Sequence, residues 1–419
     1  MDNYKIHVSG RKNLSGSIKI SGAKNASLPE LAATILSDST VILNSVPNVK
    51  DINTMLDALE GIGATGTFSE NVVNIDFSAI NKPVVPESIS KTSRASILIL
   101  GPLLARNGYA KVSMPGGCAI GDRQINYHLE GLERMGAKIK IDNGHILAES
   151  KGLKGSDYTF PGITVTGTEN LIMAATLAKG ETVLRNCAVE PEITDLIDFL
   201  KAMGAEISGE KTDTIKIKGK SILNGTSHTI IPDRIEAGTY IIAACLKGDN
   251  IVVKNCVPEH IGSLLSVLEQ MGVEIIINKD EVSVRIPGQL KPVEVNTDPY
   301  PGFPTDLQAQ LTTLFTQVEG VSRIRENIFN NRFKHVIELN KLGANIGING
   351  NIAEIKGVSG LKGTYLNATD LRASASLVLG ALIAEGETYI DNAFQLFRGY
   401  EDMPGKLNNI GAEISVTKV

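Results

Sequence analysis

Hydrophobic and polar positions follow one pattern that recurs six times along this chain. In each copy a helix rich in small apolar residues precedes a short β-rich run, and an amphipathic helix then ends at a hydrophobic residue followed by Gly. These closing glycines recur at intervals of 68–73 residues, at Gly63, Gly136, Gly204, Gly272, Gly343 and Gly411. A fixed period marks a copied structural unit, and each glycine suits a helix C-cap.

The pattern predicts the same elements in every copy, and therefore an α/β protein. The small-residue helices are expected at Ala23–Ser37, Ser93–Ala105, Thr168–Ala178, Ile235–Leu246, Asp306–Val318 and Leu371–Ala384. The β-rich runs are expected at Val41–Asn44, Ala110–Ser113, Val183–Asn186, Ile251–Asn255, Val321–Asn327 and Thr388–Asn392. One or two alternating strands complete each copy.

The chain begins in the middle of a copy, which predicts how its units are grouped. Lys5–Gly10 resembles the late strand of a unit, so the N-terminus is expected to complete the sixth unit. Three units would then form a domain over residues 22–230, and three a second domain over residues 1–21 and 231–419. Two short crossings between these domains would permit hinge closure around a ligand.

Composition narrows the classes of function. A net charge of −5, no Trp and 5% aromatic residues argue against a general nucleic-acid surface. The N-terminus has no apolar signal core, and the longest apolar stretch, Ala95–Ala105, is too short to span a bilayer. The four cysteines form no CxxC pair, so neither a zinc site nor a disulfide framework is indicated, and a reducing cytoplasm fits best.

The second unit has a longer connection between strand and helix than the other five. It spans 23 residues, against 16–19 elsewhere, and contains the sequence MPGGCAIGDR from Met114 to Arg123. Loops on a rigid frame often carry function. Because Arg123 would favour the thiolate of Cys118, we expect a reactive cysteine, whereas Cys245 reads as a core residue.

Charged residues stand at the first turns of the small-residue helices. Asp306 and Asp370 there suit helix capping. A cation at this end is unfavourable by about 0.3–1 kcal/mol, so Lys24, Arg94 and Arg372 are expected to face an anion. That anion is either a ligand phosphate or a neighbouring carboxylate, for which Asp370 beside Arg372 is a candidate.

Two further arginines, Arg332 and Arg398, lie in variable loops of later units. If the units are copies, these loops share a rim with the Cys118 loop and form a cationic cleft. Such a cleft in an acidic protein suits a small, multiply charged anion such as a sugar nucleotide or a phosphorylated acid. A solvated surface arginine is the alternative for either residue, and His128 is expected to be structural.

Five blocks resemble the signatures of the UDP-N-acetylglucosamine enolpyruvyl transferase family. They are Ser21–Asn25, Pro115–Arg123, Phe303–Gln310, Asn331–Phe333 and Ala368–Ala375. The resemblance covers essentially the whole chain. It implies two inside-out α/β barrel domains, each of three repeated βαβαββ-type units, joined by a double-crossing hinge. It also implies transfer of the enolpyruvyl group of phosphoenolpyruvate to the 3-hydroxyl of UDP-N-acetylglucosamine with release of phosphate, the first committed step of peptidoglycan synthesis.

The resemblance further implies residue roles, with no metal or cofactor. Cys118 would be the proton donor, the phosphoenolpyruvate adduct site and the fosfomycin target, and Asp306 the general base, with Lys24 and Arg398 also catalytic. Phosphoenolpyruvate contacts are implied at Lys24, Asn25, Arg123, Arg372 and Arg398. Sugar-nucleotide contacts are implied at Asn25, Arg94, Arg123, Gln124, Ile125, Asn126, Tyr127, Thr164, Val165, Thr166, Asp306, Ile328 and Phe329, with Arg332 and Asp370 supporting.

Two departures from the family pattern bear on affinity rather than on the reaction. Gln395-Leu396-Phe397 stands where many members have His-Ile-Asp, and Tyr127 stands where a smaller apolar residue is common. One alternative is the shikimate-pathway enolpyruvyl transferase, against which the cysteine loop argues. Another is a silent UDP-sugar-binding paralogue, against which the catalytic set argues. The sequence does not indicate an oligomeric state.

Overall fold

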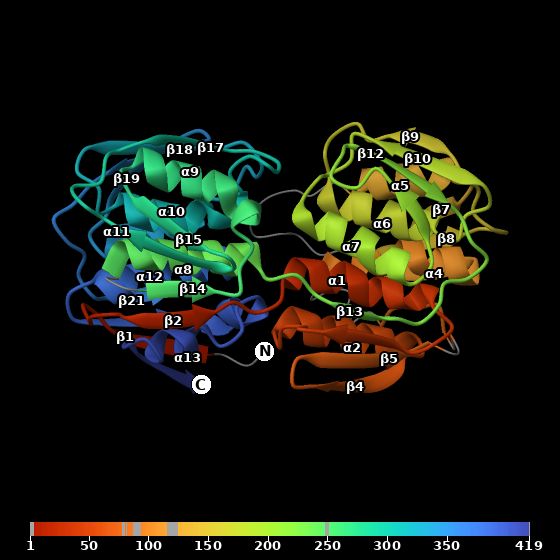
Figure 1. The fold of residues 1–419 in the computed structure, drawn as a ribbon, viewed down its shortest axis with the longest axis horizontal. Coiled ribbons are helices and arrows are strands. Elements are labelled where there is room, and N and C mark those ends of the chain that lie inside the picture. Colours follow the sequence, from red (N-terminus) through yellow and green to blue (C-terminus); the bar gives the residue numbers. More distant parts are fainter. Residues whose placement is uncertain are drawn as a thin grey trace. The chain divides into compact units, whose positions relative to one another are not determined.

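The structure is a computed structural model that describes residues 4–77, 80, 82–86, 94–114, 125–247 and 251–418. Its described residues form two compact units (Figure 1). The middle unit lies within Gly22–Ile231, and the terminal unit combines Met1–Ser21 with Pro232–Val419. The chain therefore crosses from one unit to the other after Ser21 and after Ile231. Among the described helices, none is long and apolar enough to cross a membrane.

The described elements of the middle unit alternate helices and strands. Its helices are α1 (Lys24–Ala33), η1 (Thr34–Leu36), α2 (Lys50–Ile62), η2 (Arg94–Ile99), α4 (Leu100–Asn107), α5 (Asn126–Arg134), α6 (Val165–Ala175) and α7 (Pro191–Ala202). Its strands are β3 (Val41–Asn44), β4 (Thr65–Ser69), β5 (Val72–Asp76), β6 (Tyr109–Ser113), β7 (Lys138–Asp142), β8 (His145–Glu149), β9 (Asp157–Thr159), β10 (Glu181–Arg185), β11 (Glu206–Ser208), β12 (Thr214–Lys218) and β13 (Ser227–Thr229).

The terminal unit repeats this alternation. Its helices are α8 (Arg234–Lys247), η3 (Pro258–Ile261), α9 (Gly262–Gln270), η4 (Thr305–Leu307), α10 (Gln308–Phe315), α11 (Lys334–Lys341), α12 (Leu371–Ile383), η5 (Ala393–Arg398) and α13 (Met403–Asn408). Its strands are β1 (Tyr4–Ser9), β2 (Gly16–Lys19), β14 (Ile251–Lys254), β15 (Glu274–Asn278), β16 (Glu281–Arg285), β17 (Glu294–Thr297), β18 (Val321–Glu326), β19 (Asn345–Asn349), β20 (Ile352–Lys356), β21 (Tyr365–Asn367), β22 (Glu387–Asp391) and β23 (Glu413–Lys418).

The predicted repeat is confirmed by the sheets, five of which share one four-stranded plan, while β6-β8-β7 has three strands. A central strand pairs with a parallel strand on one side and with an antiparallel hairpin on the other, as in β17-β18-β20-β19. In the sixth sheet, β21-β22-β1-β23, the N-terminal strand takes the hairpin position, with Ile6 opposite Ile390 and Val416. The prediction that the N-terminal strand completes the sixth unit is therefore confirmed.

The parallel strand of each four-stranded sheet comes from the preceding copy, and in the sheet of β6 its place is taken by a single parallel bridge between Val84 and Lys111. This arrangement closes both units. In the middle unit β13, after the third copy, pairs with β3 of the first. In the terminal unit β2, which follows β1 of the sixth copy, pairs with β14 of the fourth. Each unit is thus a closed series of three copies, with its own buried hydrophobic cluster.

The six closing glycines adopt the predicted helix-terminating geometry. Gly63 has φ +122°, and its N–H donates to the Glu60 carbonyl at 3.0 Å while Ala64 N–H donates to the Leu59 carbonyl at 2.9 Å. The other five glycines also have positive φ, and the same pair of hydrogen bonds recurs at each. These two hydrogen bonds satisfy carbonyl groups at the helix end, and the chain turns there toward the next strand.

The small-residue helices form the centre of each unit. In the terminal unit α8, α10 and α12 pack on one another, and nearly every residue of their bodies is buried. Close packing explains the glycines within them, since a Cβ on Gly238 would lie 2.5 Å from the Leu307 side chain. The predicted helix positions are confirmed, although parts of three of them are 3₁₀ helices, η1, η2 and η4.

Candidate functional site

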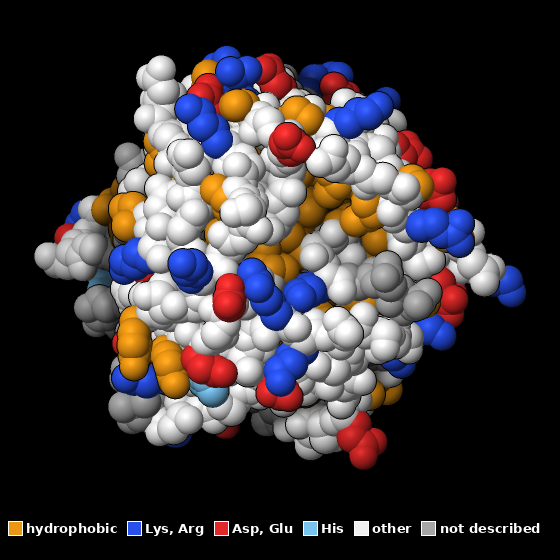
Figure 2. Space-filling view, turned by 90° about the vertical axis from the view of Figure 1, so that its left-hand side faces the viewer, with side chains coloured by type: hydrophobic (Ala, Val, Ile, Leu, Met, Phe, Trp, Pro, Cys, Tyr) orange, Lys and Arg blue, Asp and Glu red, His pale blue; other side chains and the backbone are white. Residues whose placement is uncertain are grey.

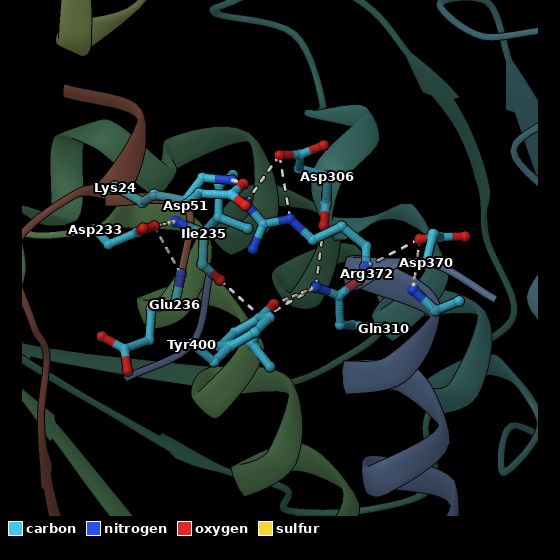
Figure 3. Close-up of polar contacts among 12 residues, drawn as sticks. Lys24, Asp51, Asp233, Ile235, Glu236, Asp306, Gln310, Asp370, Arg372 and Tyr400 are labelled. Atoms are coloured by element: carbon cyan, nitrogen blue, oxygen red, sulfur yellow. Dashed lines mark hydrogen bonds and ion pairs between the residues drawn. The ribbon is translucent and has the colours of Figure 1, made fainter. Parts of the chain in front are cut away.

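Asp306, in the terminal unit, is held by two buried arginines, Arg332 and Arg372, and Figure 3 shows its contact with Arg372. Nη2 of Arg332 donates to Asp306 Oδ1 at 2.7 Å, and Nε and Nη2 of Arg372 donate to Oδ2 at 3.2 and 2.9 Å. Both arginine side chains are 4% exposed, whereas the Asp306 side chain is 25% exposed. The two guanidinium groups thus donate three charge-assisted hydrogen bonds to one carboxylate.

Arg372 has more donors than Asp306 uses. Its guanidinium lies over the ring of Tyr400, with Cζ 5.3 Å from the ring centroid. Burial alone would lower the pKa of Arg372, but Asp306, Tyr400 and Asp233 raise it overall. Nη1 is buried and has no hydrogen-bond partner among the described residues. Because a buried unpaired donor is unfavourable, this nitrogen indicates a position for an acceptor that the described chain does not supply.

A polar network fixes the ring under this guanidinium. The Tyr400 hydroxyl accepts from Gln310 Nε2 at 3.0 Å and shares a hydrogen bond with Thr239 Oγ1 at 2.9 Å. Gln310 Nε2 also lies 3.0 Å from the backbone oxygen of Asp306, to which it donates (Figure 3). The first turn of α10 and the ring of Tyr400 are thereby held in one arrangement.

Glu326, at the end of β18, organises the segment beside Asp306, and no sequence pattern had indicated it. The carboxylate is 3% exposed. Its Oε1 accepts from the N–H groups of Ile328 and Phe329 at 2.9 and 3.0 Å, and its Oε2 from Thr305 Oγ1 at 2.9 Å. One buried carboxylate therefore joins two predicted sugar-nucleotide contacts to the residue that precedes Asp306.

Asp370 is a helix cap and does not pair with the Arg372 side chain. Its Oδ1 accepts from the N–H groups of Arg372 and Ala373, both at 3.0 Å, at the start of α12. The candidate ion pair between these neighbours is therefore wrong. Position i+2 in a helix points away from the cap, so the guanidinium of Arg372 reaches Asp306 instead.

Arg398, the last residue of η5, is half-buried. Its Nη1 donates to Gln395 Oε1 at 3.2 Å. Phe397 packs edge-on against Tyr4 of β1, with ring centroids 5.3 Å apart. Gln395 therefore orients Arg398, and Phe397 packs η5 on the N-terminal strand. Both residues belong to the segment that departs from the family pattern.

Lys24 is the first residue of α1 in the middle unit, and the structure pairs it with a carboxylate. Its Nζ lies 3.3 Å from Oδ2 of Asp51, in the first turn of α2, and both side chains are 10% exposed. This contact offsets the unfavourable position of a cation at a helix N-terminus. Asn25 follows Lys24 in α1 and is partly buried.

The start of α6 carries a hydroxyl that a buried histidine orients. Gly101 N–H donates to Asn170 Oδ1 at 2.7 Å, which fixes the amide so that Nδ2 donates to the Ile97 carbonyl at 2.8 Å and to His128 Nδ1 at 2.9 Å. His128 Nε2 is then the protonated nitrogen, and it donates to Thr166 Oγ1 at 3.2 Å. The hydroxyl hydrogen of Thr166 is thus directed elsewhere, and the structural role predicted for His128 is confirmed.

The remaining predicted sugar-nucleotide contacts of the middle unit lie at two helix starts. Thr164 is the N-cap of α6 and accepts from Gly167 N–H at 3.2 Å, and Val165 follows it. Ile125 precedes α5 and is buried, Asn126 is exposed, and Tyr127 packs partly against the hydrophobic cluster. Cys118, Arg123, Gln124 and the side chain of Arg94 lie outside the described residues.

The three described cysteines are buried and unpaired with one another. Burial raises the pKa of the Cys187 and Cys245 thiols to about 12 and that of Cys256 to about 11. None of these three thiols is a reactive thiolate at neutral pH. The prediction that Cys245 is a core residue is confirmed.

Charges on the outer surface of the terminal unit are mixed in sign. On the face in Figure 2, Lys and Arg side chains are interspersed with Asp and Glu rather than gathered into one basic patch. Many of these charges are paired across neighbouring strands, as Arg323 is with Glu294 and Glu354. This face offers no continuous basic surface for a polyanion.

The chain matches the family of EPSP synthase (3-phosphoshikimate 1-carboxyvinyltransferase) over residues 8–407. A UDP-N-acetylglucosamine 1-carboxyvinyltransferase of Koribacter versatilis is 51% identical, over 99% of this chain and 96% of the relative. A protein of the same name from Hydrogenovibrio crunogenus is 48% identical, over 98% of this chain and 99% of the relative.

Two solved structures with similar folds are also named as enolpyruvyl transferase and EPSP synthase. The enolpyruvyl transferase NikO from Streptomyces tendae aligns over 100% of both chains with a TM-score of 0.91 and 25% identity. An EPSP synthase from Acinetobacter baumannii shares the fold over 99% of this chain and 100% of its own, with a TM-score of 0.72 and 18% identity.

The chain therefore belongs to the EPSP synthase family of enolpyruvyl transferases, which has a mixed α/β fold. Within that family it is similar over nearly its whole length to UDP-N-acetylglucosamine 1-carboxyvinyltransferases.

Proposed function

We propose that the chain transfers the enolpyruvyl group of phosphoenolpyruvate to the 3-hydroxyl of UDP-N-acetylglucosamine and releases phosphate. The observation that carries this is the 51% identity, over 99% of the chain, to a UDP-N-acetylglucosamine 1-carboxyvinyltransferase. The paired arginines around Asp306 support it. Peptidoglycan synthesis as the pathway and the cytoplasm as the compartment stay predictions from the sequence.

The proposed fold is two inside-out α/β barrels. The closed series of three copies in each unit supports this fold, because the helices lie in the centre and the sheets outside them. The proposed domain limits are residues 22–230 for one barrel and 1–21 with 231–419 for the other, and the double-crossing hinge between them remains a prediction.

The reaction needs two proton transfers and a site for several negative charges. A base takes the proton of the sugar 3-hydroxyl as its oxygen bonds to the central carbon of phosphoenolpyruvate, while an acid protonates the methylene carbon. Loss of that proton and of phosphate then restores the double bond on the new ether. We assign the base to Asp306 and the acid to Cys118, because a carboxylate can accept a proton and the thiol is the predicted donor.

The anionic groups need fixed cations. We assign phosphoenolpyruvate to Lys24, Asn25, Arg123, Arg372 and Arg398. The buried Nη1 of Arg372, which lacks a partner among the described atoms, supports this assignment, since a phosphate or carboxylate oxygen would pair with it.

The sugar nucleotide is assigned to the remaining predicted contacts. The oriented hydroxyl of Thr166 and the segment that Glu326 holds are the features that support this. The residues are Asn25, Arg94, Arg123, Gln124, Ile125, Asn126, Tyr127, Thr164, Val165, Thr166, Asp306, Ile328 and Phe329.

A phosphate-release assay tests the function. Purified protein with phosphoenolpyruvate and UDP-N-acetylglucosamine should release phosphate, and mass spectrometry should find the enolpyruvyl ether of the sugar nucleotide. Replacing the sugar nucleotide by shikimate 3-phosphate should abolish release. Phosphate release from phosphoenolpyruvate with shikimate 3-phosphate, but not with UDP-N-acetylglucosamine, would instead favour the 3-phosphoshikimate 1-carboxyvinyltransferase activity that the family description names.

Alkylation should be selective for one cysteine. Because burial raises the pKa of Cys187, Cys245 and Cys256, a small anionic epoxide such as fosfomycin should label Cys118 alone. Peptide mapping after exposure measures this, and Cys118→Asp should resist inactivation while retaining activity. Label on a buried cysteine, or full sensitivity of the Asp variant, would contradict the assignment.

Removing the Thr166 hydroxyl should weaken sugar-nucleotide binding. Thr166→Val loses one hydrogen bond worth about 0.5–1.5 kcal/mol, so KM for the sugar nucleotide should rise about 3–10-fold with little change in kcat. Thr166→Ser keeps the hydroxyl and should behave like the wild type. Equal KM values for the Val and Ser variants would remove the hydroxyl from the binding role.

A further inference from the structure

Tyr400 is buried among the three central helices of the terminal unit, and the proposed reaction assigns it no role. Its backbone N–H donates to the Leu396 carbonyl at 3.1 Å, which ties it to η5, the helix that ends at Arg398. Its ring and hydroxyl contact residues of α8, α10 and α12 (Figure 3). One side chain thus connects the helices that carry Arg372 and Arg398 with the helix that follows Asp306.

The ring of Tyr400 supports the guanidinium of Arg372 from one face. Cζ of Arg372 lies 5.3 Å from the ring centroid, within the range of a cation–π contact, and both side chains are buried. The hydrogen bonds from Nε and Nη2 to Asp306 fix one edge of the same guanidinium. Because the group is planar, holding its face and one edge also fixes the direction of Nη1. The ring therefore helps to set where Arg372 presents this nitrogen, which has no partner among the described residues.

The hydroxyl of Tyr400 belongs to a series of hydrogen bonds with a single direction. Thr239 Oγ1 donates to the Ile235 carbonyl at 2.8 Å, which uses its only hydrogen. The Tyr400 hydroxyl must then donate to Thr239 Oγ1 at 2.9 Å, and it accepts from Gln310 Nε2 at 3.0 Å. Burial raises the pKa of Tyr400, although Arg372 opposes the rise, so the hydroxyl keeps its proton at neutral pH.

Gln310 extends this order to Asp306. Its Nε2 donates one hydrogen to the backbone oxygen of Asp306 at 3.0 Å, and since that oxygen can only accept, the amide is oriented with its nitrogen on this side. The second hydrogen is shared between the Tyr400 hydroxyl and Thr239 Oγ1, each 3.0 Å away. The turn that presents the Asp306 carboxylate is therefore held, through Gln310, by the Tyr400 hydroxyl.

Packing alone does not require this hydroxyl. A phenylalanine ring would fill nearly the same volume without burying a polar group, which is unfavourable unless it is hydrogen-bonded. What the hydroxyl adds is the fixed order of the hydrogen bonds that end at Ile235 and Asp306. The ring and the hydroxyl of Tyr400 thus act on two different residues of the site.

We propose that Tyr400 is a positioning residue with two separable actions, a proposal that rests on the proposed function. Its ring orients Arg372 and so sets the affinity for phosphoenolpyruvate. Its hydroxyl acts through Gln310 on Asp306 and so sets the rate of the chemical step. Neither action requires Tyr400 to touch a substrate.

Two substitutions separate these actions. Tyr400→Phe keeps the ring and removes the hydroxyl, so kcat should fall about 10-fold while KM for phosphoenolpyruvate stays within about twofold, because a small displacement of a reacting group lowers the rate steeply. Tyr400→Leu also removes the ring, so KM for phosphoenolpyruvate should in addition rise at least about 10-fold. Steady-state kinetics at saturating UDP-N-acetylglucosamine measures both constants.

Two further variants distinguish positioning from a general loss of packing. Phe315 is fully buried at the far end of α10, so Phe315→Leu should lower the melting temperature without changing KM for phosphoenolpyruvate. Gln310→Met should reproduce the loss of kcat in Tyr400→Phe, and the double variant should lose no more than either single variant, because both remove the same connection.

The outcomes that would overturn the proposal are distinct. An equal rise of KM in Phe315→Leu and Tyr400→Leu would remove the role of the ring. Unchanged kcat in Tyr400→Phe, or multiplied losses in the double variant with Gln310→Met, would remove the role of the hydroxyl. A wild-type protein that released no phosphate from these substrates would contradict the proposed function, and the roles of Tyr400 would fall with it, whereas an active wild type with unaffected variants would contradict only the roles of Tyr400.

Discussion

Replacing Asp306 with asparagine is expected to lower turnover by at least about 10²-fold, because the amide keeps the shape of the side chain but cannot take the proton of the sugar hydroxyl. Arg332 donates to one oxygen of Asp306 and Arg372 to the other, so the single amide oxygen can serve only one of them, and the melting temperature should fall. Sugar-nucleotide binding should still weaken less than turnover falls. Steady-state kinetics with both substrates, together with the melting temperature, measures this.

The matched control for this variant is Asp298→Asn. Asp298 is an exposed aspartate in the same segment, eight residues before Asp306, and its carboxylate contacts only Asn327 among the described side chains. Its loss should leave turnover within about twofold, as for most surface substitutions. Near-normal turnover in Asp306→Asn would remove that residue from the role of base.

Removing the amine of Lys24 is expected to affect both stability and turnover, and the two effects can be separated. Lys24→Ala leaves the carboxylate of Asp51 in a position that is 90% buried. Breaking a buried pair typically destabilises a fold by about 3–5 kcal/mol. Turnover should fall at least about 10²-fold as well, because the variant lacks one of the cations assigned to phosphoenolpyruvate.

The double variant Lys24→Ala, Asp51→Asn distinguishes these effects. It removes the buried charge that Lys24→Ala leaves without its lysine, so the free energy of unfolding should rise above that of the single variant, as measured in urea, whereas turnover should not recover. If turnover returned together with stability, Lys24 would be a structural residue and its assignment to phosphoenolpyruvate would fail.

Periodicity predicted the repeated elements, the helix-ending glycines and the strand that the N-terminus adds to the sixth sheet. These features depend on local spacing and on Gly geometry, which a sequence carries directly. The change from α to 3₁₀ geometry at η4 was not predictable, since hydrophobic spacing over three residues does not distinguish the two helices.

Partners of the polar residues were harder to predict. The sequence identified Lys24, Arg94 and Arg372 as unusual at helix starts, but the only protein partner it offered for Arg372 was a neighbour in sequence, Asp370. The actual partner lies 66 residues away and reaches Arg372 only because α10 and α12 pack together. Glu326 had no signal at all, because a buried acid at a strand end looks like a surface residue in an alternating pattern.

The pairing of β1 with β22 and β23 also sets the order in which the chain can assemble during synthesis. The described strands of the middle unit all lie between Gly22 and Ile231, so they are available once Ile231 has been made. The first strand of the terminal unit, by contrast, has no hairpin partner until β23 has been made. At about 5–20 residues per second, that interval is roughly 10–40 s. If the middle unit folds as it emerges, the terminal unit closes last, when β1 joins β22 and β23.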